Sequence, residues 1–383
     1  MERAKKTLTI TLLVLTVLLI TSYLPTPCQA ETYNVAYQLL DQPNGSTHYR
    51  LNVAIPQSLY EYYQSQSHRL NTDDDFAKFV TPHALEPIAE NLWQIYTDDE
   101  DFANGVLMIV HQIPYMETLP VKYPVETMVE NEGDCDLFSY IAASILKAGG
   151  LDVVLLYYKN EAHMNIGVSL SHQPYDARGW AYYVMYKNVK YYVAECTGGN
   201  WQIGWRVGEC PDDLKQALKT VQVIGLENGE QASPGQVSAS YQTLTASSIS
   251  LTVSPMFLIQ GGTVTISGQL SPQLQNETVV IYIQENNSPW TILQTLTTDS
   301  EGRFACVWNV KTTGMCYVRA SWSGNEEYAG ADSSIYAITI VSMLFVLLLA
   351  IVIVVVCIGV VIALMTRQKQ PQIPEPSPPE IPS

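Results

Sequence analysis

The sequence predicts an α+β domain, followed by an all-β sandwich and one membrane-spanning helix near the C-terminus. Residues 31–215 mix helical and strand patterns, which is typical of an α+β domain. Residues 249–335 show short alternating strands separated by turn signals, as in a β-sandwich. An uncharged apolar run then occupies residues 341–365. Between the two domains, residues 216–248 are rich in Gly, Ser, Thr and Gln and are expected to form a linker.

Length and charge limit the possible partners of the chain. The 383 residues carry a net charge of −17, from 37 acidic and 20 basic side chains. Single cores rarely grow past about 250 residues, so more than one domain is expected. The negative charge argues against nucleic acid or an anionic lipid surface as a partner, because both would repel it. A hydrophobic content of 47% excludes a disordered acidic chain.

The N-terminus, residues 1–30, has the pattern of a secretory signal peptide. A basic start is followed by an apolar run from Leu8 to Ile20. The segment ends in Cys28-Gln29-Ala30, which places small residues at the −3 and −1 positions of a cleavage site. An uncleaved anchor helix is the alternative. In both cases the domains that follow are expected outside the cytoplasm.

The apolar run 341–365 is expected to cross the plasma membrane once. At about 1.5 Å per helical residue it exceeds a hydrocarbon core of about 30 Å, so it spans with some tilt. Arg367 and Lys369 follow it, which places the C-terminus in the cytoplasm. The proline-rich residues 366–383 form no helix and are expected to be a short extended tail.

The second domain, residues 249–335, is expected to be an immunoglobulin-like β-sandwich, because about seven short strands fit into it. The stretch Gly302–Trp308, together with Ala320–Gly324, resembles bacterial and archaeal Ig-like repeats. Those motifs are structural, so the expected role is a spacer that raises the first domain above the membrane. Binding of a carbohydrate or a protein is the alternative.

The cysteines differ in their expected roles. Cys306 and Cys316 are expected to lie opposite one another on a hairpin, where an oxidising exterior favours a disulfide; two buried thiols are the alternative. Cys196 and Cys210 are the next natural pair. Cys135 is then left without a partner. An unpaired thiol in an exported domain invites oxidation, so a functional reason for Cys135 is expected.

Cys135 is predicted to begin an amphipathic helix. The apolar residues Phe138, Ile141, Ala142, Ile145 and Leu146 share one helical face, and Gly149-Gly150 ends the pattern. In the first helical turn the dipole favours a thiolate, and the free N–H groups can stabilise an oxyanion. Asp134 and Asp136 oppose the thiolate, so a histidinium partner is expected to matter.

His163 and Glu195 are the predicted partners of this thiol. His163 starts a strand-like run, and Glu195 closes the last strand of a later hairpin with a Lys187-Asn188 turn. A cysteine, a histidine and an acid in this layout are typical of nucleophilic catalysis. His172 is the alternative base and Glu161 the alternative acid. A zinc site built from Cys135, His163, Cys196 and Cys210 lacks a C-x-x-C pair, so no metal or cofactor is expected.

Two acidic clusters, Asp73–Asp75 and Asp98–Asp101, precede helix-like segments. Neither contains the glycine of a recognisable calcium loop. Acidic residues at helix starts are stabilised by the helix dipole, so that is their expected role, with calcium binding as the alternative.

The segment Gly133–Ser139 and the turn Gly149–Val153 resemble the transglutaminase-like superfamily over about residues 85–210. The resemblance implies a papain-like core with Cys135 as nucleophile, His163 as base and Glu195 in the usual aspartate position. Two features depart from the family pattern. Met164-Asn165 follows the histidine where an aromatic residue is frequent, and glutamate replaces aspartate.

The expected function is therefore that of a membrane-anchored, extracytoplasmic thiol enzyme. A Cys-His-Glu triad would attack amide bonds as a peptidase, an amidase or an acyl transferase, on a protein or peptide substrate of the cell envelope. A non-catalytic surface protein that binds peptide or glycan is the main alternative, and a laterally assembling envelope component is another. The sequence sets neither the substrate nor the oligomeric state.

Overall fold

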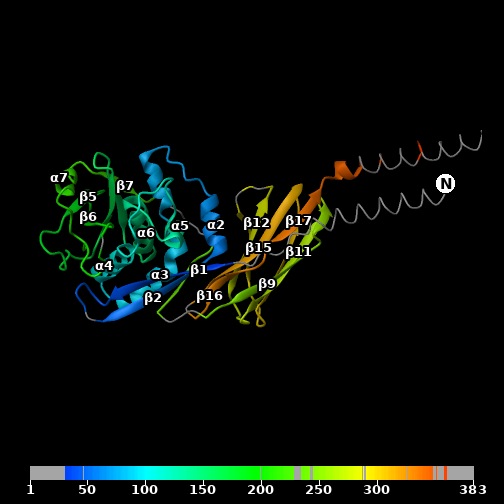
Figure 1. Ribbon diagram of the computed structural model, residues 1–383, viewed down its shortest axis with the longest axis horizontal. Coiled ribbons are helices and arrows are strands. Elements are labelled where there is room, and N and C mark those ends of the chain that lie inside the picture. Colours follow the sequence, from blue (N-terminus) through cyan, green and yellow to red (C-terminus); the bar gives the residue numbers. More distant parts are fainter. Residues whose placement is uncertain are drawn as a thin grey trace, which may run out of the picture.

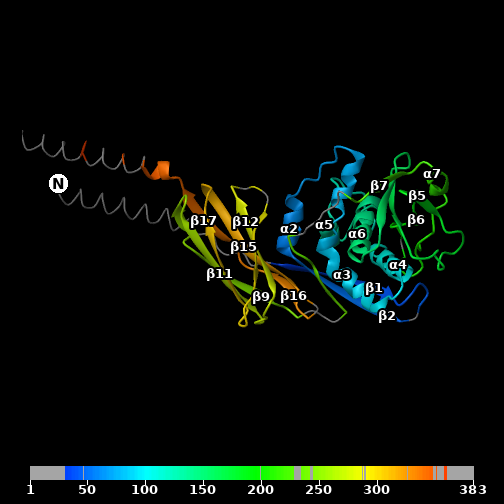
Figure 2. The same cartoon turned by 180° about the vertical axis from the view of Figure 1, so that it is seen from behind.

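The chain forms two lobes that lie side by side along the longest axis of the molecule (Figure 1). The computed structural model describes residues 31–45, 47–198, 200–227, 234–241, 245–286, 288, 290–325, 327–347, 351 and 358–359. Helices α2 to α7 and two sheets make up the first lobe, and two further sheets make up the second. The view from behind shows the same division (Figure 2).

A five-stranded antiparallel sheet organises the first lobe. Its strand order is β5-β6-β4-β3-β7. The strands are β3 (Val153–Tyr158), β4 (His163–Val168), β5 (Tyr183–Tyr186), β6 (Val189–Ala194) and β7 (Gln222–Gly225). Lys187 and Asn188 join β5 to β6 with φ angles of 49° and 65°, the left-handed values that a two-residue hairpin turn requires. The predicted Lys187-Asn188 turn is thus confirmed.

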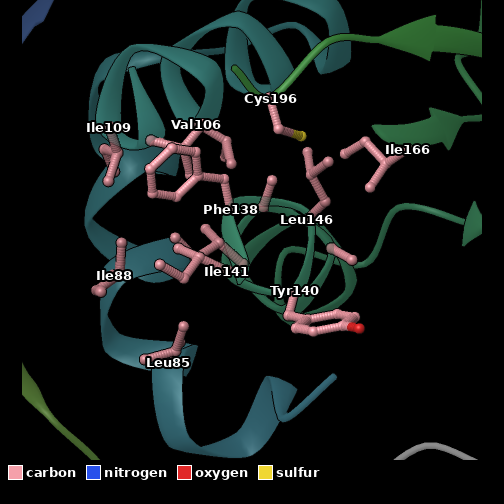
Figure 3. Close-up of a cluster of buried hydrophobic side chains, with 14 of the residues drawn as sticks. Leu85, Ile88, Val106, Ile109, Phe138, Tyr140, Ile141, Leu146, Ile166 and Cys196 are labelled. Atoms are coloured by element: carbon pink, nitrogen blue, oxygen red, sulfur yellow. The ribbon is translucent and has the colours of Figure 1, made fainter. Parts of the chain in front are cut away.

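Helices cover one face of this sheet and share its main core. They are α3 (Pro82–Ile95), α4 (Asp99–Val110) and α6 (Cys135–Ala148). Buried residues from the three helices and from β4 meet in one cluster: Leu85, Ile88, Val106, Ile109, Phe138, Ile141, Leu146 and Ile166 (Figure 3). The predicted helix from Cys135 to the Gly149-Gly150 end is confirmed, and so is its buried face.

The opposite face of the sheet carries a smaller core. Val154, Leu156 and Tyr158 of β3 pack there with Cys210 and with Leu214 of the short helix α7 (Leu214–Ala217). Cys196 instead lies in the main core, between α6 and the sheet (Figure 3). The two cysteines of the expected pair therefore belong to different cores, and both are free thiols.

A second sheet of the first lobe contains a long hairpin. Strands β1 (Thr32–Leu40) and β2 (His48–Pro56) pair along their whole length, from Thr32↔Pro56 to Leu40↔His48, and β8 (Ser238–Ser240) pairs with β2. Both β8 and β7 come from the stretch 216–248 that was expected to be a linker. The stretch 216–248, which follows the predicted first domain, thus returns to the first lobe and adds a strand to each of its two sheets.

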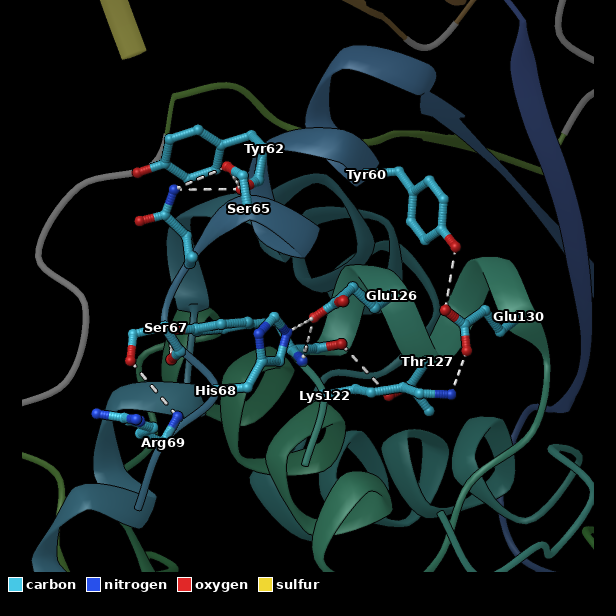
Figure 4. A network of polar contacts seen from close by, with 12 residues as sticks. Tyr60, Tyr62, Ser65, Ser67, His68, Arg69, Lys122, Glu126, Thr127 and Glu130 are labelled. Carbon is cyan, nitrogen blue, oxygen red and sulfur yellow. Dashed lines mark hydrogen bonds and ion pairs between the residues drawn. The ribbon is translucent and has the colours of Figure 1, made fainter. Parts of the chain in front are cut away.

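Two helices and a polar network support the segment that leads into α6. The helices are α2 (Gln57–Ser65) and α5 (Pro124–Glu130), with the 3-10 turn η1 (Asp73–Phe79) between them in the chain. His68 lies 2.9 Å from Glu126, and the Tyr60 hydroxyl donates to Glu130 at 3.0 Å (Figure 4). Lys122 pairs with the same Glu130. The network holds α5 in place, four residues before the start of the α6 segment at Asp134.

The second lobe is a β-sandwich. One sheet has the order β10-β17-β15-β12-β13, with β16 paired to β15, and the other has the order β14-β11-β9. The strands are β9 (Ser248–Ser254), β10 (Phe257–Ile259), β11 (Thr263–Ser271), β12 (Thr278–Glu285), β13 (Thr291–Thr297), β14 (Arg303–Asn309), β15 (Gly314–Gly324), β16 (Ala329–Asp332) and β17 (Tyr336–Val341).

Cys306 on β14 and Cys316 on β15 do not share a hairpin. The two strands belong to different sheets, because the connection 310–313 crosses from one layer of the sandwich to the other. Both cysteines point into the core between the sheets and are free thiols. The expectation that they pair across a hairpin is therefore wrong, and the alternative of two buried thiols describes the structure.

The predicted fold class needs correction. Strands make up 37% of the structure and helices 25%, and the described residues form no clear papain-like α+β core. The prediction extended a short motif around Cys135 to a whole architecture, whereas local motifs do not determine how sheets are assembled. Additional strands raise the strand content of the first lobe. They are β1 and β2, from the expected N-terminal extension, and β7 and β8, from the expected linker.

The membrane helix of the predicted fold class is not found either. Among the described residues, no helix has the length and apolar character needed to cross a membrane. Of the expected span 341–365, the structure describes only residues 341–347, 351 and 358–359. The expected signal peptide, residues 1–30, and the proline-rich tail, residues 366–383, lie outside the described residues.

A buried arginine joins the two lobes. Arg319 on β15 is 2% exposed and donates to Glu61 of α2 and to the carbonyl oxygen of Ser58. Its guanidinium carbon lies 4.2 Å from the centre of the Trp290 ring. Asp332 accepts hydrogen bonds from the backbone N–H and the hydroxyl of Ser58. Burial raises the pKa of Asp332, and the charge of Arg319 partly offsets that rise.

We expect Arg319→Met to lower the free energy of unfolding by about 3 kcal/mol at pH 7, because Glu61 and Asp332 would lose their buried countercharge. Without the arginine the pKa of Asp332 rises further, so a larger fraction of Asp332 is protonated at pH 4. The loss in free energy of unfolding is therefore smaller at pH 4 than at pH 7. Denaturant titrations at both pH values measure the difference. Arg303→Met is the control, since its exposed pair with Glu301 contributes little. Equal losses for the two variants would contradict the account.

Candidate functional site

The candidate site is built around Cys135 at the start of α6. Cys135 is the first residue of the helix and is half-buried. Asp134 occupies the N-cap position, but its side chain makes no capping bond; its Oδ2 accepts the Thr118 N–H at 2.9 Å. A Cβ atom at Gly133 would lie 3.0 Å from Thr127 Cγ2 and 3.1 Å from Phe138. Glycine therefore allows the tight approach to the helix.

The structure brings His163 to this thiol. His163 is the first residue of β4, and its imidazole lies close enough to the Cys135 thiol for the thiol to raise the pKa of the imidazole. The Ser139 hydroxyl of α6 donates to the Met164 carbonyl oxygen at 3.2 Å, which ties the helix to the strand next to the histidine. The imidazole is 19% exposed, so one edge remains accessible to solvent.

Glu195 completes the predicted set. It follows β6 directly and is fully buried, and its Oε2 lies 3.0 Å from His163 Nε2. The Thr197 N–H donates to Oε1 at 2.9 Å. The Glu195 carbonyl oxygen also has a partner, Nε2 of the buried His111 at 3.0 Å. All three residues singled out in the sequence therefore meet at one point.

Two further residues of this cluster were missed in the sequence. Asn165 is fully buried and its Nδ2 donates to Glu195 Oε2 at 2.9 Å. The hydroxyl of the buried Tyr158 lies near Asn165, and neither this hydroxyl nor Asn165 Oδ1 has a hydrogen-bond partner among the described residues. Tyr158 pairs with His163 across the β3–β4 hairpin, so both point to the same face. The alternation of His163 and Asn165 along β4 was the available signal.

The electrostatics of the cluster favour an ionised pair. Burial alone lowers the pKa of His163, but its hydrogen bonds to Cys135 and Glu195, together with their charges, raise it to about 10. Burial raises the pKa of Glu195, yet the hydrogen bonds from His163, Thr197 and Asn165 bring it below its ordinary value. At neutral pH the imidazole is therefore positively charged and the carboxylate negatively charged.

Asp136, beside Cys135, keeps its proton at neutral pH. Burial, followed by the hydrogen bond and the charge of the neighbouring Asp134, raises the pKa of Asp136 to about 8. Asp134 Oδ1 is buried and has no donor among the other described groups. A protonated Asp136 supplies the donor that this oxygen lacks. The sequence suggested two charges that oppose the thiolate, and protonation of Asp136 removes one of them at neutral pH.

A cleft of about 660 Å³ opens beside this cluster. Its volume is in the range of small-molecule and peptide sites. The walls come from residues 111–115, 197–198, 205, 211 and 213–214, with the β3–β4 turn at one end. Tyr115, Glu161, His163, Trp205 and Asp213 are among the side chains that line the cleft.

The alternative residues from the sequence lie in other surroundings. His172 contacts Asp98 at 2.9 Å rather than Cys135, and Asp98 caps α4 through the Glu100 and Asp101 N–H groups, as expected for an acidic helix start. Ligand atoms of Asp98, Asp99 and His172 lie within 4.8 Å of one another. Of the conceivable zinc site, Cys196 lies in the main core with Cys135 packed against it, whereas Cys210 lies in the smaller core.

No protein-family model matches the chain, and no curated protein matches it. Among solved structures it is similar to a chitin-binding domain from Burkholderia pseudomallei, with 13% identity over 22% of this chain and 55% of that one, at a TM-score of 0.19. It is also similar to a tetra-tandem repeat from the extending region of a large adhesion protein, with 12% identity over 49% and 42% of the two chains, at a TM-score of 0.22. BslA, a bacterial hydrophobin, aligns at 12% identity over 26% of this chain and 98% of its own, with a TM-score of 0.17.

This chain thus spans less than two thirds of the chitin-binding domain and of the adhesion repeat. Scores this low decide neither fold nor function.

We expect the His163 imidazole to stay protonated at pH 8 and to lose its charge near pH 10. Because the folded pKa exceeds the unfolded one, the contribution of this group to stability is complete below pH 6.5 and is lost as the pH rises through about 10. Glu195→Gln removes one of the two partners that raise the pKa, so the value should fall toward 6.5. NMR titration of ¹⁵N-histidine-labelled protein measures it, with His172 as the internal control. An unchanged His163 titration in Glu195→Gln would refute the pairing.

We expect Asp136→Asn to raise the melting temperature increasingly as the pH goes from 5 to 9. The folded wild type resists ionisation of Asp136 up to about pH 8, whereas the unfolded chain ionises near 4, so the wild type loses stability over this window. Asparagine carries no such penalty. Thermal denaturation at several pH values tests this, with the exposed Asp74→Asn as the control. A difference that does not vary with pH would show that the pKa of Asp136 is not raised in the folded protein.

Proposed function

We propose that the chain is a thiol-dependent enzyme that attacks amide bonds, with Cys135 as nucleophile, His163 as base and Glu195 as the group that orients the base. The observation that supports this most strongly is the contact between a fully buried carboxylate and a cationic imidazole that also faces a free thiol. A buried ion pair of this kind is costly to maintain for stability alone.

The first step of the proposed reaction forms a thioester. The Cys135 sulfur bonds to the amide carbonyl carbon, and the C–N bond of the amide then breaks. Since Nε2 of His163 is engaged with Glu195, the proton exchanged with the thiol is carried on Nδ1 and passes from there to the departing amine. Backbone N–H groups in the first turn of α6 lack helical acceptors and can stabilise the oxyanion.

The second step releases the product. Water attacks the thioester carbon, His163 takes a proton from the water, and the C–S bond breaks to give a carboxylic acid and the thiol. An amine in place of water gives a new amide instead, so hydrolysis and acyl transfer use the same residues. Glu195 stays ionised throughout and keeps the imidazole in one orientation.

Asn165 and Tyr158 act in this proposal as positioning residues. The carboxylate of Glu195 accepts hydrogen bonds from three side chains, and the Asn165 amide is the donor fixed deepest in the sheet. The signal-peptide pattern of residues 1–30 belongs to the same proposal, because it would direct the enzyme out of the cytoplasm.

We expect iodoacetamide to label Cys135 at least tenfold faster than the buried Cys210 at pH 7, since a thiolate paired with an imidazolium is the reactive form. His163→Ala should lower the rate of Cys135 labelling at least tenfold. Peptide mapping by mass spectrometry of the full chain, without reductant, measures both rates. Slow labelling of Cys135, or its recovery in a disulfide, would favour a non-catalytic binding protein.

Turnover is tested on a casein digest, with ammonia release and new peptide termini as the two readouts. Cys135→Ala should abolish both signals, while Cys210→Ala, which removes a thiol of the smaller core, should retain them. Activity that persists in Cys135→Ala would exclude the proposed nucleophile.

A further inference from the structure

The cleft beside His163 carries negative charge at two places. Glu161 lies in the β3–β4 turn, two residues before His163, and Asp213 lies on the segment that leads into α7. Both side chains line the cleft and both residues are exposed to solvent. Among the described residues, no lysine or arginine lines this cleft, and neither carboxylate forms an ion pair.

Basic side chains close to the cleft are already neutralised. Lys215 pairs with Asp212, the residue next to Asp213. Arg178 donates to Glu209 at 2.6 Å, and both residues line a second hollow that shares Trp205 with the cleft. The carboxylates of Glu161 and Asp213 are therefore available to interact with water or with a ligand that enters the cleft.

Aromatic side chains complete the wall. Trp205 is half-buried and Tyr115 is 58% exposed, and both line the cleft. Tyr115 is held in place through its bridge to Gly133 and its edge contact with Phe138, whose ring centre lies 6.3 Å away. Aromatic faces attract cations and pack against the apolar stems of long basic side chains.

From this charge pattern we propose that the cleft selects peptide amides that carry a cationic side chain, above all a guanidinium, next to the amide attacked by Cys135. The inference rests on the proposed function for the reaction, but the binding it describes does not require turnover. Opposite charges across an interface increase both association and specificity. An acidic side chain at the same position would face two carboxylates without a counter-ion.

The test compares two peptides that differ only in charge. The peptides are acetyl-Ala-Arg-Gln-Ala-amide and the same peptide with citrulline in place of arginine, which is neutral and nearly identical in shape. The protein is the full chain with Cys135→Ala, so that nothing is turned over. Isothermal titration calorimetry in 50 mM NaCl should give at least fivefold tighter binding for arginine, and the preference should shrink in 500 mM NaCl because salt screens the carboxylates.

Substitutions then assign the preference to the two carboxylates. Glu161→Gln and Asp213→Asn, each in the Cys135→Ala background, should each reduce the arginine preference at least twofold, and the double variant should abolish it. Asp212→Asn is the matched control. It removes a charge next to Asp213 that does not line the cleft and is already paired with Lys215, so the preference should remain.

The outcomes separate this inference from the proposed function. Equal affinity for the two peptides, no binding of either, or a preference that survives the double variant would each overturn the selectivity. If Cys135-dependent turnover of casein peptides is nevertheless present, the proposed reaction is supported and only the selectivity is wrong. A preference that depends on Glu161 and Asp213, found in a chain whose wild type turns over no amide, would leave the cation site standing and remove the enzyme.

Discussion

The arrangement of the first lobe depends on one buried negative charge. An ionised carboxylate as deeply buried as Glu195 is unstable unless its oxygens are hydrogen-bonded and its charge is paired. Its partners come from separate elements: His163 and Asn165 from β4, and Thr197 from the chain beyond β6. The pairing of Ala194 with Ile166 places Glu195 beside Asn165. A shift of one residue in that register would point the donors to the other face of the sheet.

At Cys135 the constraint is repulsion between a thiolate and the neighbouring carboxylates. A helix start favours a thiolate, but Asp134 and Asp136 flank Cys135 and would repel it. Asp136 is protonated at neutral pH, and the Thr118 N–H donates to Asp134 Oδ2. The imidazolium of His163 supplies a compensating positive charge. Cys135, the aspartates and His163 therefore form one electrostatic unit that spans α6 and β4.

Local patterns predicted much of this site and little of the architecture around it. The start of α6 at Cys135, the strand that begins at His163 and the hairpin before Glu195 each depend on short-range periodicity or turn chemistry. The role of Asn165 depends on register between strands, which no local pattern encodes. The same limit explains Cys306 and Cys316, whose strands are neighbours in sequence but lie in opposite sheets. It also explains the strands β7 and β8, which were hidden in a stretch of linker-like composition.

Chemistry and selectivity are placed on different parts of the fold. The residues proposed to react lie at the ends of α6, β4 and β6, where packing holds them rigidly, whereas Glu161 and Asp213 lie on connections at the rim of the cleft. Connections tolerate substitution better than buried strands do, and binding specificity commonly resides there. Exchange of the rim carboxylates would therefore alter which amides enter without disturbing the hydrogen bonds of Glu195. Because most basic side chains around the cleft are already paired, even a single neutralised rim carboxylate would change the local field substantially.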